Sequence, residues 1–308
     1  MVDLSVIYSP QFLEHDTGES HLEHPDRLLA CIAALEDGDL SERIIWNSPR
    51  MATETELEWI HTRQHIDHIK AFCQNGGGYL DVDTPVCPKS FHISCLSAGA
   101  WLTGMDEVLD QKRSALVLSR PPGHHAESDR PMGFCLFSNC ALAAHYAVKK
   151  KGLKKVAVFD WDVHHGNGTQ NILETEGSFA YCSIHQSLNY PGTGHESETG
   201  SHDNVLNIPL PFRSGRAEYV GAMEEKVLPF LSDFQPDALI ISAGFDAALR
   251  DPLSDMALEP EDYAELTELC LKISPFLLLG LEGGYHLQTL TQSVRAVSQT
   301  IIHHQESL

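Results

Sequence analysis

Two aspartates and a histidine at alternating positions give the segment 156–168 the strongest chemical signal in the chain. Asp160, Asp162 and His164 end a run of β-branched and aromatic residues that predicts a buried parallel strand, and Gly166-Asn167-Gly168 predicts a turn into a helix. Alternate side chains of an extended strand share one face, so these three would point the same way. Burying two carboxylates and an imidazole is costly unless a cation lies among them. A lone Asp or His after a strand is usually a helix cap or a solvated loop residue, but this combination predicts a divalent metal site.

Polar residues also follow three further predicted strands, at 114–119, 238–243 and 276–281. His124 and His125 come after the first strand and a rigid Pro-Pro-Gly turn. Asp246 follows the second strand, and Tyr285 follows the third. Because the carboxyl ends of parallel strands meet at one edge of a sheet, we expect all four loops to form a single site.

The chemistry of these residue types suggests metal-assisted hydrolysis of an amide. Asp162, His164 and Asp246 would hold zinc with open coordination positions, although an oxygen and nitrogen set without thiolate also suits iron or cobalt. A histidine pair can supply both a base for water and an acid for the leaving amine. The hydroxyl of Tyr285 can donate to an oxyanion. A His-His pair alone often only caps a turn and a lone tyrosine usually packs, so the prediction depends on their convergence.

The elements that position these residues alternate between strands and helices. This pattern predicts a single α/β domain over 1–308, with a mainly parallel central sheet and helices on both faces. Within the helix predicted over 54–73, His65 and His68 are expected to be solvated surface residues. The other predicted strands span 4–8, 179–184 and 205–209, besides the one that begins at Val156. The other helices span 25–35, 92–109, 139–150, 218–231, 260–272 and the C-terminal end.

The composition restricts the class of partner. The formal net charge is −22, from 21 Lys and Arg against 43 Asp and Glu, which argues against nucleic acid and favours a cationic substrate. No apolar run is long enough to span a membrane, and the N-terminus lacks the pattern of a signal peptide. The eight cysteines contain no Cys-x-x-Cys pair, so we expect free thiols and a cytoplasmic location.

Five ordered stretches resemble the histone deacetylase superfamily, in particular its class II branch. The resemblance implies a three-layer, arginase-like α/β fold and a metal-dependent deacetylase. The matching stretches are Arg120-Pro-Pro-Gly-His-His-Ala-Glu127, Gly133-Phe-Cys135, Asp160-Trp-Asp-Val-His-His-Gly-Asn-Gly-Thr-Gln170, Ser242-Ala-Gly-Phe-Asp-Ala247 and Leu281-Glu-Gly-Gly-Tyr285.

By this resemblance, one zinc ion is held by Asp162, His164 and Asp246. His125 is implied as the general base and acid and His124 as chiefly electrostatic, while Tyr285 polarises the substrate carbonyl. Asp160 is implied to orient His124, and Asn167 to face His125 where class I relatives carry Asp. Potassium is implied at the backbone oxygens of Asp160, Asp162, His164 and Ser183, together with the Asp160 side chain. Arg27 is implied to line an internal channel behind the metal.

The substrate is expected to enter a tunnel that accepts a linear stem carrying an amide, either acyl-lysine or an acetylated polyamine. The implied tunnel residues are Gly133, Phe134, Tyr190 and Leu253, and relatives usually have Phe at the position of Tyr190. A gate residue Leu253 in place of an acidic residue favours acyl-lysine amides. Two other classes stay open: an arginase-type ureohydrolase with two manganese ions, and an inactive acyl-lysine reader.

Overall fold

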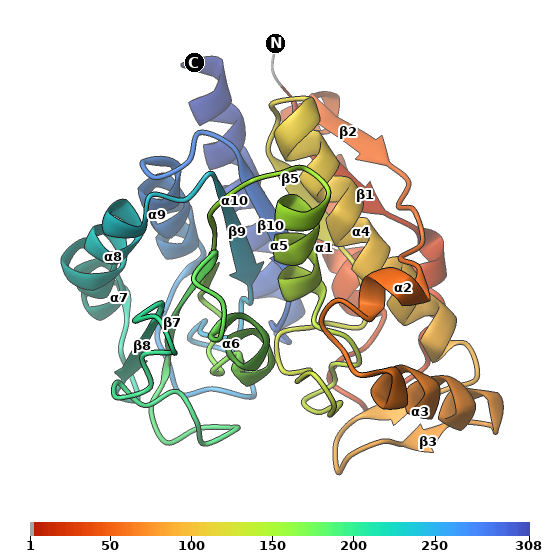
Figure 1. The fold of residues 1–308 in the computed structure, drawn as a ribbon. Coiled ribbons are helices and arrows are strands. Elements are labelled where there is room, and N and C mark those ends of the chain that lie inside the picture. The colour runs from red at the N-terminus through yellow and green to blue at the C-terminus, as the bar shows by residue number, and fades with distance from the viewer. Residues whose placement is uncertain (1–2) are drawn as a thin grey trace.

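The computed structural model describes residues 3–308 and is built around one eight-stranded sheet (Figure 1). The strand order is β2-β1-β5-β10-β9-β6-β7-β8, and all neighbouring strands are parallel. The strands are β1 (Leu4–Tyr8), β2 (Ile44–Asn47), β5 (Ala115–Leu118), β6 (Val156–Asp160), β7 (Phe179–Gln186), β8 (Val205–Leu210), β9 (Ala238–Ala243) and β10 (Leu277–Leu281). This arrangement confirms the predicted parallel α/β fold.

Helices cover both faces of the sheet. On one face α4 packs against α5 and both contact the sheet, while on the other face α10 packs between α1 and α9 (Figure 1). The helices are α1 (Asp26–Glu36), α2 (Glu54–Leu57), α3 (Arg63–Gln74), α4 (Ser90–Asp110), α5 (Asn139–Lys149), α6 (Asn167–Leu173), α7 (Arg216–Ala222), α8 (Leu228–Phe234), α9 (Pro260–Leu271) and α10 (Leu287–Glu306), with short 3₁₀ turns at Pro10–Glu14 and Gly38–Arg43.

Burial explains why the central strands read as continuous apolar runs. Every residue of β5, β6, β9 and β10 is buried, because helices cover both of their faces. Since all the strands run the same way, the loops that follow them lie at one edge of the sheet. The polar residues identified at strand ends are therefore brought to a common edge.

The helix predicted over 54–73 is in fact two helices. α2 ends at Leu57, and α3 begins after Thr62, whose side chain accepts a hydrogen bond from the backbone N–H of His65. A threonine at this position caps the new helix and so restarts it in a different direction. His68 is exposed as expected, but the prediction for His65 was wrong: this ring is buried and stacks on His61 with centroids 4.7 Å apart.

The helix predicted over 218–231 is longer and irregular. α7 and α8 are joined by a π-helical turn over Met223–Val227, and Pro229 lies in the first turn of α8. Proline has no N–H to donate and its ring crowds the preceding turn, which accounts for the wider turn before it.

Three short strands were missed by the sequence patterns. β2 is a four-residue edge strand, and the glycine-rich stretch forms a two-residue hairpin pairing of β3 (Gly78–Tyr79) with β4 (Pro85–Val86). Elements this short carry too few residues to show a periodicity. Across residues 3–308, no helix combines the length and apolarity that crossing a bilayer requires.

Candidate active site

Three side chains at the C-terminal edge of the sheet form a group that could hold a metal ion. Asp162 and His164 follow β6, and Asp246 follows the adjacent strand β9. Each offers one ligand atom, and these atoms lie within 4.8 Å of one another. Nδ1 of His164 lies 3.1 Å from Oδ1 of Asp162 and 3.2 Å from Oδ2 of Asp246. The strand itself ends at Asp160, so a turn rather than a continued strand brings Asp162 and His164 together.

The surroundings of this group fit a cation. Burial would lower the pKa of His164, but Asp162 and Asp246 outweigh this effect and raise that pKa to about 10. The two carboxylates therefore favour a positive charge between them. Oδ2 of Asp246 is buried and accepts no hydrogen bond within the part of the chain that the structure describes. Its charged neighbour is the His164 ring at 3.2 Å, itself a candidate ligand, so a bound cation would supply the partner that a buried carboxylate oxygen needs. The donor set of two carboxylate oxygens and one imidazole nitrogen suits zinc.

Two glycines leave room for the carboxylates. A Cβ atom at Gly244 would stand 2.1 Å from Oδ2 of Asp162, and one at Gly283 would stand 1.9 Å from Oδ2 of Asp246. Gly283 also donates its backbone N–H to Oδ2 of Asp162 over 2.8 Å. The glycines therefore allow the loops to close around the acidic group.

The first of the tandem histidines contacts carboxylates. Nδ1 of His124 lies 3.1 Å from Oδ2 of Asp160, and Nε2 lies 3.8 Å from Oδ1 of Asp162. Burial favours the neutral ring, but Asp162 and Asp160 outweigh it and raise the pKa of His124 well above its usual value. The hydroxyl of Tyr181 also donates to Asp160. His124 is therefore suited to carry positive charge.

The second histidine is set up as a neutral ring. Its Nδ1 atom lies 2.9 Å from Oδ1 of Asn167, whose Nδ2 donates to Oε1 of Glu127 over 2.8 Å. Because the Asn167 N–H₂ group must face this carboxylate, its oxygen faces His125, and Nδ1 of His125 must carry the proton. Burial, assisted by the charge of His124, lowers the pKa of His125 well below its usual value. The lone pair of Nε2 is then free to accept a proton.

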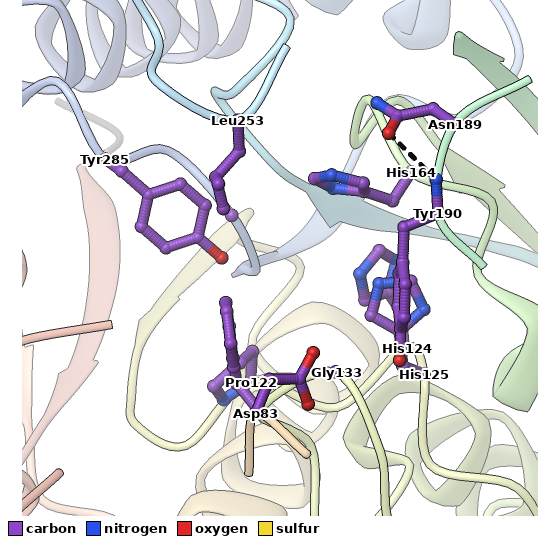
Figure 2. Close-up of a pocket in the computed structure, with 12 residues that line it drawn as sticks. Asp83, Pro122, His124, His125, Gly133, His164, Asn189, Tyr190, Leu253 and Tyr285 are labelled. Carbon is purple, nitrogen blue, oxygen red and sulfur yellow. Dashed lines mark hydrogen bonds between the residues drawn. The ribbon is translucent and has the colours of Figure 1, made fainter. Parts of the chain in front are cut away.

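One pocket contains the histidine pair, His164 and Tyr285 (Figure 2). Figure 2 shows the Tyr285 hydroxyl directed into the space between these groups. All four predicted tunnel residues line the pocket, and Asp83 and Asn189 also line it, although the sequence did not single them out. The lining residues are Asp83, Pro122, His124, His125, Gly133, Phe134, His164, Asn189, Tyr190, Leu253, Gly283 and Tyr285.

Aromatic rings form part of the pocket wall. The ring of Tyr190 packs edge-on against His125 with centroids 5.0 Å apart, and Phe134 packs edge-on against Tyr285 with centroids 6.0 Å apart. Phe134 has a φ of 68°, a left-handed conformation that is uncommon for a bulky residue. Backbone strain of this kind is concentrated at functional sites. The wall offers apolar ring faces to a slender substrate chain.

Arg27, a buried residue of α1, supports the Tyr285 loop. Its guanidinium donates to the backbone oxygens of Gly284 and Glu282 and lies 4.7 Å from the centre of the Tyr285 ring. Arg27 also pairs with Glu23, a buried carboxylate that Arg120 binds through two nitrogens. The arginine is therefore a buried support for the tyrosine loop.

A further buried carboxylate, Glu282, was missed as a site residue. Its Oε2 atom accepts the backbone N–H groups of Gly123 and His124 at 2.7 and 3.2 Å, and Ser242 donates to Oε1. Burial raises the pKa of Glu282 to about 7, although the charge of His124 opposes this. The carboxylate thus holds the turn that carries the histidine pair. Its position directly after β10, beside the Gly-Gly-Tyr motif, was the available sequence signal.

Comparison with known proteins agrees with this geometry. Residues 21–301 match the model of the histone deacetylase domain. An uncharacterized protein of Synechocystis sp. is 47% identical over 294 residues, which cover 94% of this chain and 97% of that protein. A probable deacetylase of Methanothermobacter thermautotrophicus is 39% identical, with 94% and 87% covered.

Two further matches have lower sequence identity, and each is a protein with a specific name. The human polyamine deacetylase HDAC10 is 35% identical over 93% of this chain and 45% of its own length. The crystal structure of the HDA15 HD domain superposes with a TM-score of 0.93 and 35% identity, covering 99% of this chain and 90% of that one. The chain belongs to the histone deacetylase family. It has the three-layer fold of that family, and its relatives include proteins named deacetylase.

Proposed function

We propose that this protein is a zinc-dependent amidohydrolase that removes acetyl or other short acyl groups from acyl-lysine-type amides, and that residues 1–308 form one catalytic domain. The observation that carries the proposal is that the histidine pair, Tyr285 and the metal-binding group meet in a single pocket. A reducing, cytoplasmic location is part of the proposal and is supported by eight free cysteines.

Asp162, His164 and Asp246 would hold the zinc ion. When bound, zinc would supply a Lewis acid that lowers the pKa of water and polarises an amide carbonyl. Nε2 of His125 would take the proton from the attacking water and later deliver it to the leaving amine. The Asn167 contact keeps that nitrogen free, because it fixes the proton of His125 on Nδ1.

His124 and Tyr285 would stabilise the developing negative charge. His124 stays cationic beside Asp160 and Asp162 and therefore offers electrostatic stabilisation without giving up its proton. Burial raises the pKa of Tyr285 well above its usual value, so its phenol stays protonated and can donate a hydrogen bond to the oxyanion.

Potassium is a further proposed ligand, at the backbone oxygens of Asp160, Asp162, His164 and Ser183. Ser183 lies beside Asp160 in the register of β6 and β7, which supports the idea that their backbones serve one ion. Activity that rises with potassium and not with sodium at constant ionic strength would support it.

Acetylated polyamines are the alternative substrate class. Leu253 places an apolar side chain on the pocket wall, which favours acyl-lysine. Asp83 places a carboxylate on the same wall, and the net charge of −22 also favours a cationic substrate. Similarity to a protein named polyamine deacetylase supports this alternative.

One experiment compares the candidate functions. Purified protein is analysed for bound metal and assayed by kcat/KM with acyl-lysine peptides beside acetylputrescine, acetylcadaverine and acetylspermidine. One zinc per chain with turnover of acyl-lysine supports the proposal, and faster turnover of the polyamines supports the alternative. Two manganese ions would indicate a ureohydrolase, and zinc without any turnover would indicate an inactive reader.

A further inference from the structure

Asp251 contacts two residues of the pocket wall through one carboxylate. Its Oδ2 atom accepts the backbone N–H of Tyr285 over 2.7 Å, and its Oδ1 atom accepts the backbone N–H of Leu253 over 3.0 Å. Tyr285 and Leu253 both line the pocket, on the loops that follow the adjacent strands β10 and β9. A single side chain therefore links the tunnel wall to the proposed oxyanion donor.

The location of this carboxylate is unfavourable for stability. Asp251 is only 6% exposed. Burial, together with the charge of Asp246, raises the pKa of Asp251 to about 7. A carboxylate that is costly to ionise is retained only where its acceptors are needed, and such groups are concentrated at functional sites. Here the ionised side chain satisfies the backbone N–H groups of Tyr285 and Leu253, and that of His286 also favours its charged form.

Arg27 and Asp162 hold other backbone groups of the loop 282–285, whereas Asp251 holds the backbone N–H of Tyr285. Arg27 binds the carbonyl oxygens of Glu282 and Gly284, and the N–H of Gly283 donates to Asp162. The N–H of Tyr285 itself is held by Asp251. The tyrosine follows Gly284, whose φ of 114° is a conformation that glycine adopts readily, so this hydrogen bond anchors the residue next to a permissive backbone position.

We propose that Asp251 is a positioning residue: it fixes the Tyr285 backbone relative to the Leu253 wall and thereby holds the phenol where the reaction needs it. This inference rests on the proposed amidohydrolase function. Asp251 acts through Tyr285, because its own oxygen atoms are engaged by backbone N–H groups and it does not itself line the pocket.

A double-mutant cycle tests this role. Asp251→Asn keeps the size of the side chain but turns an N–H₂ group toward one of the two backbone donors. We expect kcat for an acetyl-lysine peptide to fall on the order of 10- to 100-fold, with a smaller change in KM, because a small displacement of a catalytic group is that costly. In a Tyr285→Phe background the same substitution should change kcat by less than about twofold, because effects of residues that act as a unit are non-additive.

A matched variant separates positioning from a general loss of stability. Asp262 is 9% exposed, and its Oδ2 atom accepts the backbone N–H of Glu259 at the start of α9. Asp262→Asn should lower the melting temperature and leave kcat unchanged. Asp251→Glu keeps a charged acceptor and should recover part of the lost kcat, which also provides a test if Asp251→Asn does not fold.

The outcomes separate this inference from the proposed function. If wild-type protein turns over none of the amides, the proposed function is wrong. If wild-type protein is active and the losses from Asp251→Asn and Tyr285→Phe multiply, Asp251 does not act through Tyr285 and the inference is overturned. Equal activity of Asp251→Asn and wild-type protein would overturn it as well.

Discussion

The backbone N–H of Gly283 lies 2.8 Å from Oδ2 of Asp162 and donates a hydrogen bond to it. This contact joins the loop of the proposed oxyanion donor directly to a proposed metal ligand. Two residues later in the same loop, Tyr285 is held by Asp251. The position of the phenol and the shape of the metal site are therefore coupled through a few backbone atoms.

Substitution of Gly283 by Ala should weaken zinc binding without changing a ligand. The new Cβ atom would meet Oδ2 of Asp246 at 1.9 Å and Oδ2 of Asp162 at 2.6 Å, so both carboxylates would have to move. We expect zinc affinity to fall at least 10-fold, as for other disturbances of groups that orient metal ligands. The measurement is competition with a fluorescent chelator. Gly221→Ala is the control, since nothing lies within 4 Å of a Cβ there, and equal affinity in both variants would contradict the prediction.

Tyr285→Phe should retain stoichiometric zinc and lose on the order of 100-fold in kcat, the usual cost of removing one oxyanion donor. The readouts are metal content and steady-state kinetics with an acetyl-lysine peptide. Tyr190→Phe is a matched control. Tyr190 also lines the pocket, but its hydroxyl makes no hydrogen bond within residues 3–308. Full activity of Tyr285→Phe would remove the phenol from the mechanism.

Leu253→Glu should shift the substrate preference toward acetylpolyamines. The side chain lines the pocket, so a carboxylate there would attract the second cation of a polyamine. A partly exposed ion pair contributes about 1 kcal/mol, which corresponds to roughly a fivefold change in the kcat/KM ratio of acetylspermidine to acetyl-lysine peptide. Leu249→Glu adds the same charge at an exposed position of the same loop that is not part of the pocket lining. An identical shift in both variants would show that net charge alone is responsible.

Stability should fall as the pH is lowered from 7.5 to 5, in part because of His61. This buried ring lies between the carbonyl oxygen of Glu127 at Nδ1 and the N–H of Ser138 at Nε2, both at 3.0 Å, an arrangement that requires neutral imidazole. Burial, together with the neighbouring His65, lowers the pKa of His61 from 6.5 to about 3. Between these values the unfolded chain binds the proton and the folded protein does not. Stability is therefore lost as the pH falls below about 6.5, by roughly 1–2 kcal/mol at pH 5.

The measurement for His61 is the melting temperature as a function of pH. His61→Gln should flatten the curve, whereas His68→Gln changes an exposed ring on the neighbouring helix and should not. Parallel curves for wild-type protein and His61→Gln would show that His61 makes no contribution.

The sequence predicted the fold because its signals were local. Buried apolar strands, alternating helices and the chemistry at strand ends all follow from residue type and spacing, and so did the pocket-lining residues His124, His125 and Tyr285. Phe134 was expected in the pocket only from the family resemblance. Thr62 and Pro229 were readable signals for the helix irregularities, because each changes the backbone by its own chemistry.

The buried carboxylates could not be assigned in the same way. The roles of Glu282 and Asp251 depend on backbone N–H groups more than 30 residues away, as in the contact between Glu282 and Gly123. Similarly, His65 is buried because it packs against His61 and Phe137 and reaches the carbonyl oxygen of Leu136. Such contacts exist only once the sheet has assembled.

The support that Arg27 gives to the carbonyl oxygens of Glu282 and Gly284 joins two parts of the chain separated by more than 250 residues. During synthesis the pocket therefore cannot form until residues 282–285 have left the ribosome, because the part of its wall that carries Tyr285 rests on α1. Activity should consequently appear only after residues 282–285 have been made, and a chain cut anywhere between Arg27 and Glu282 would need both pieces to remain associated in order to work.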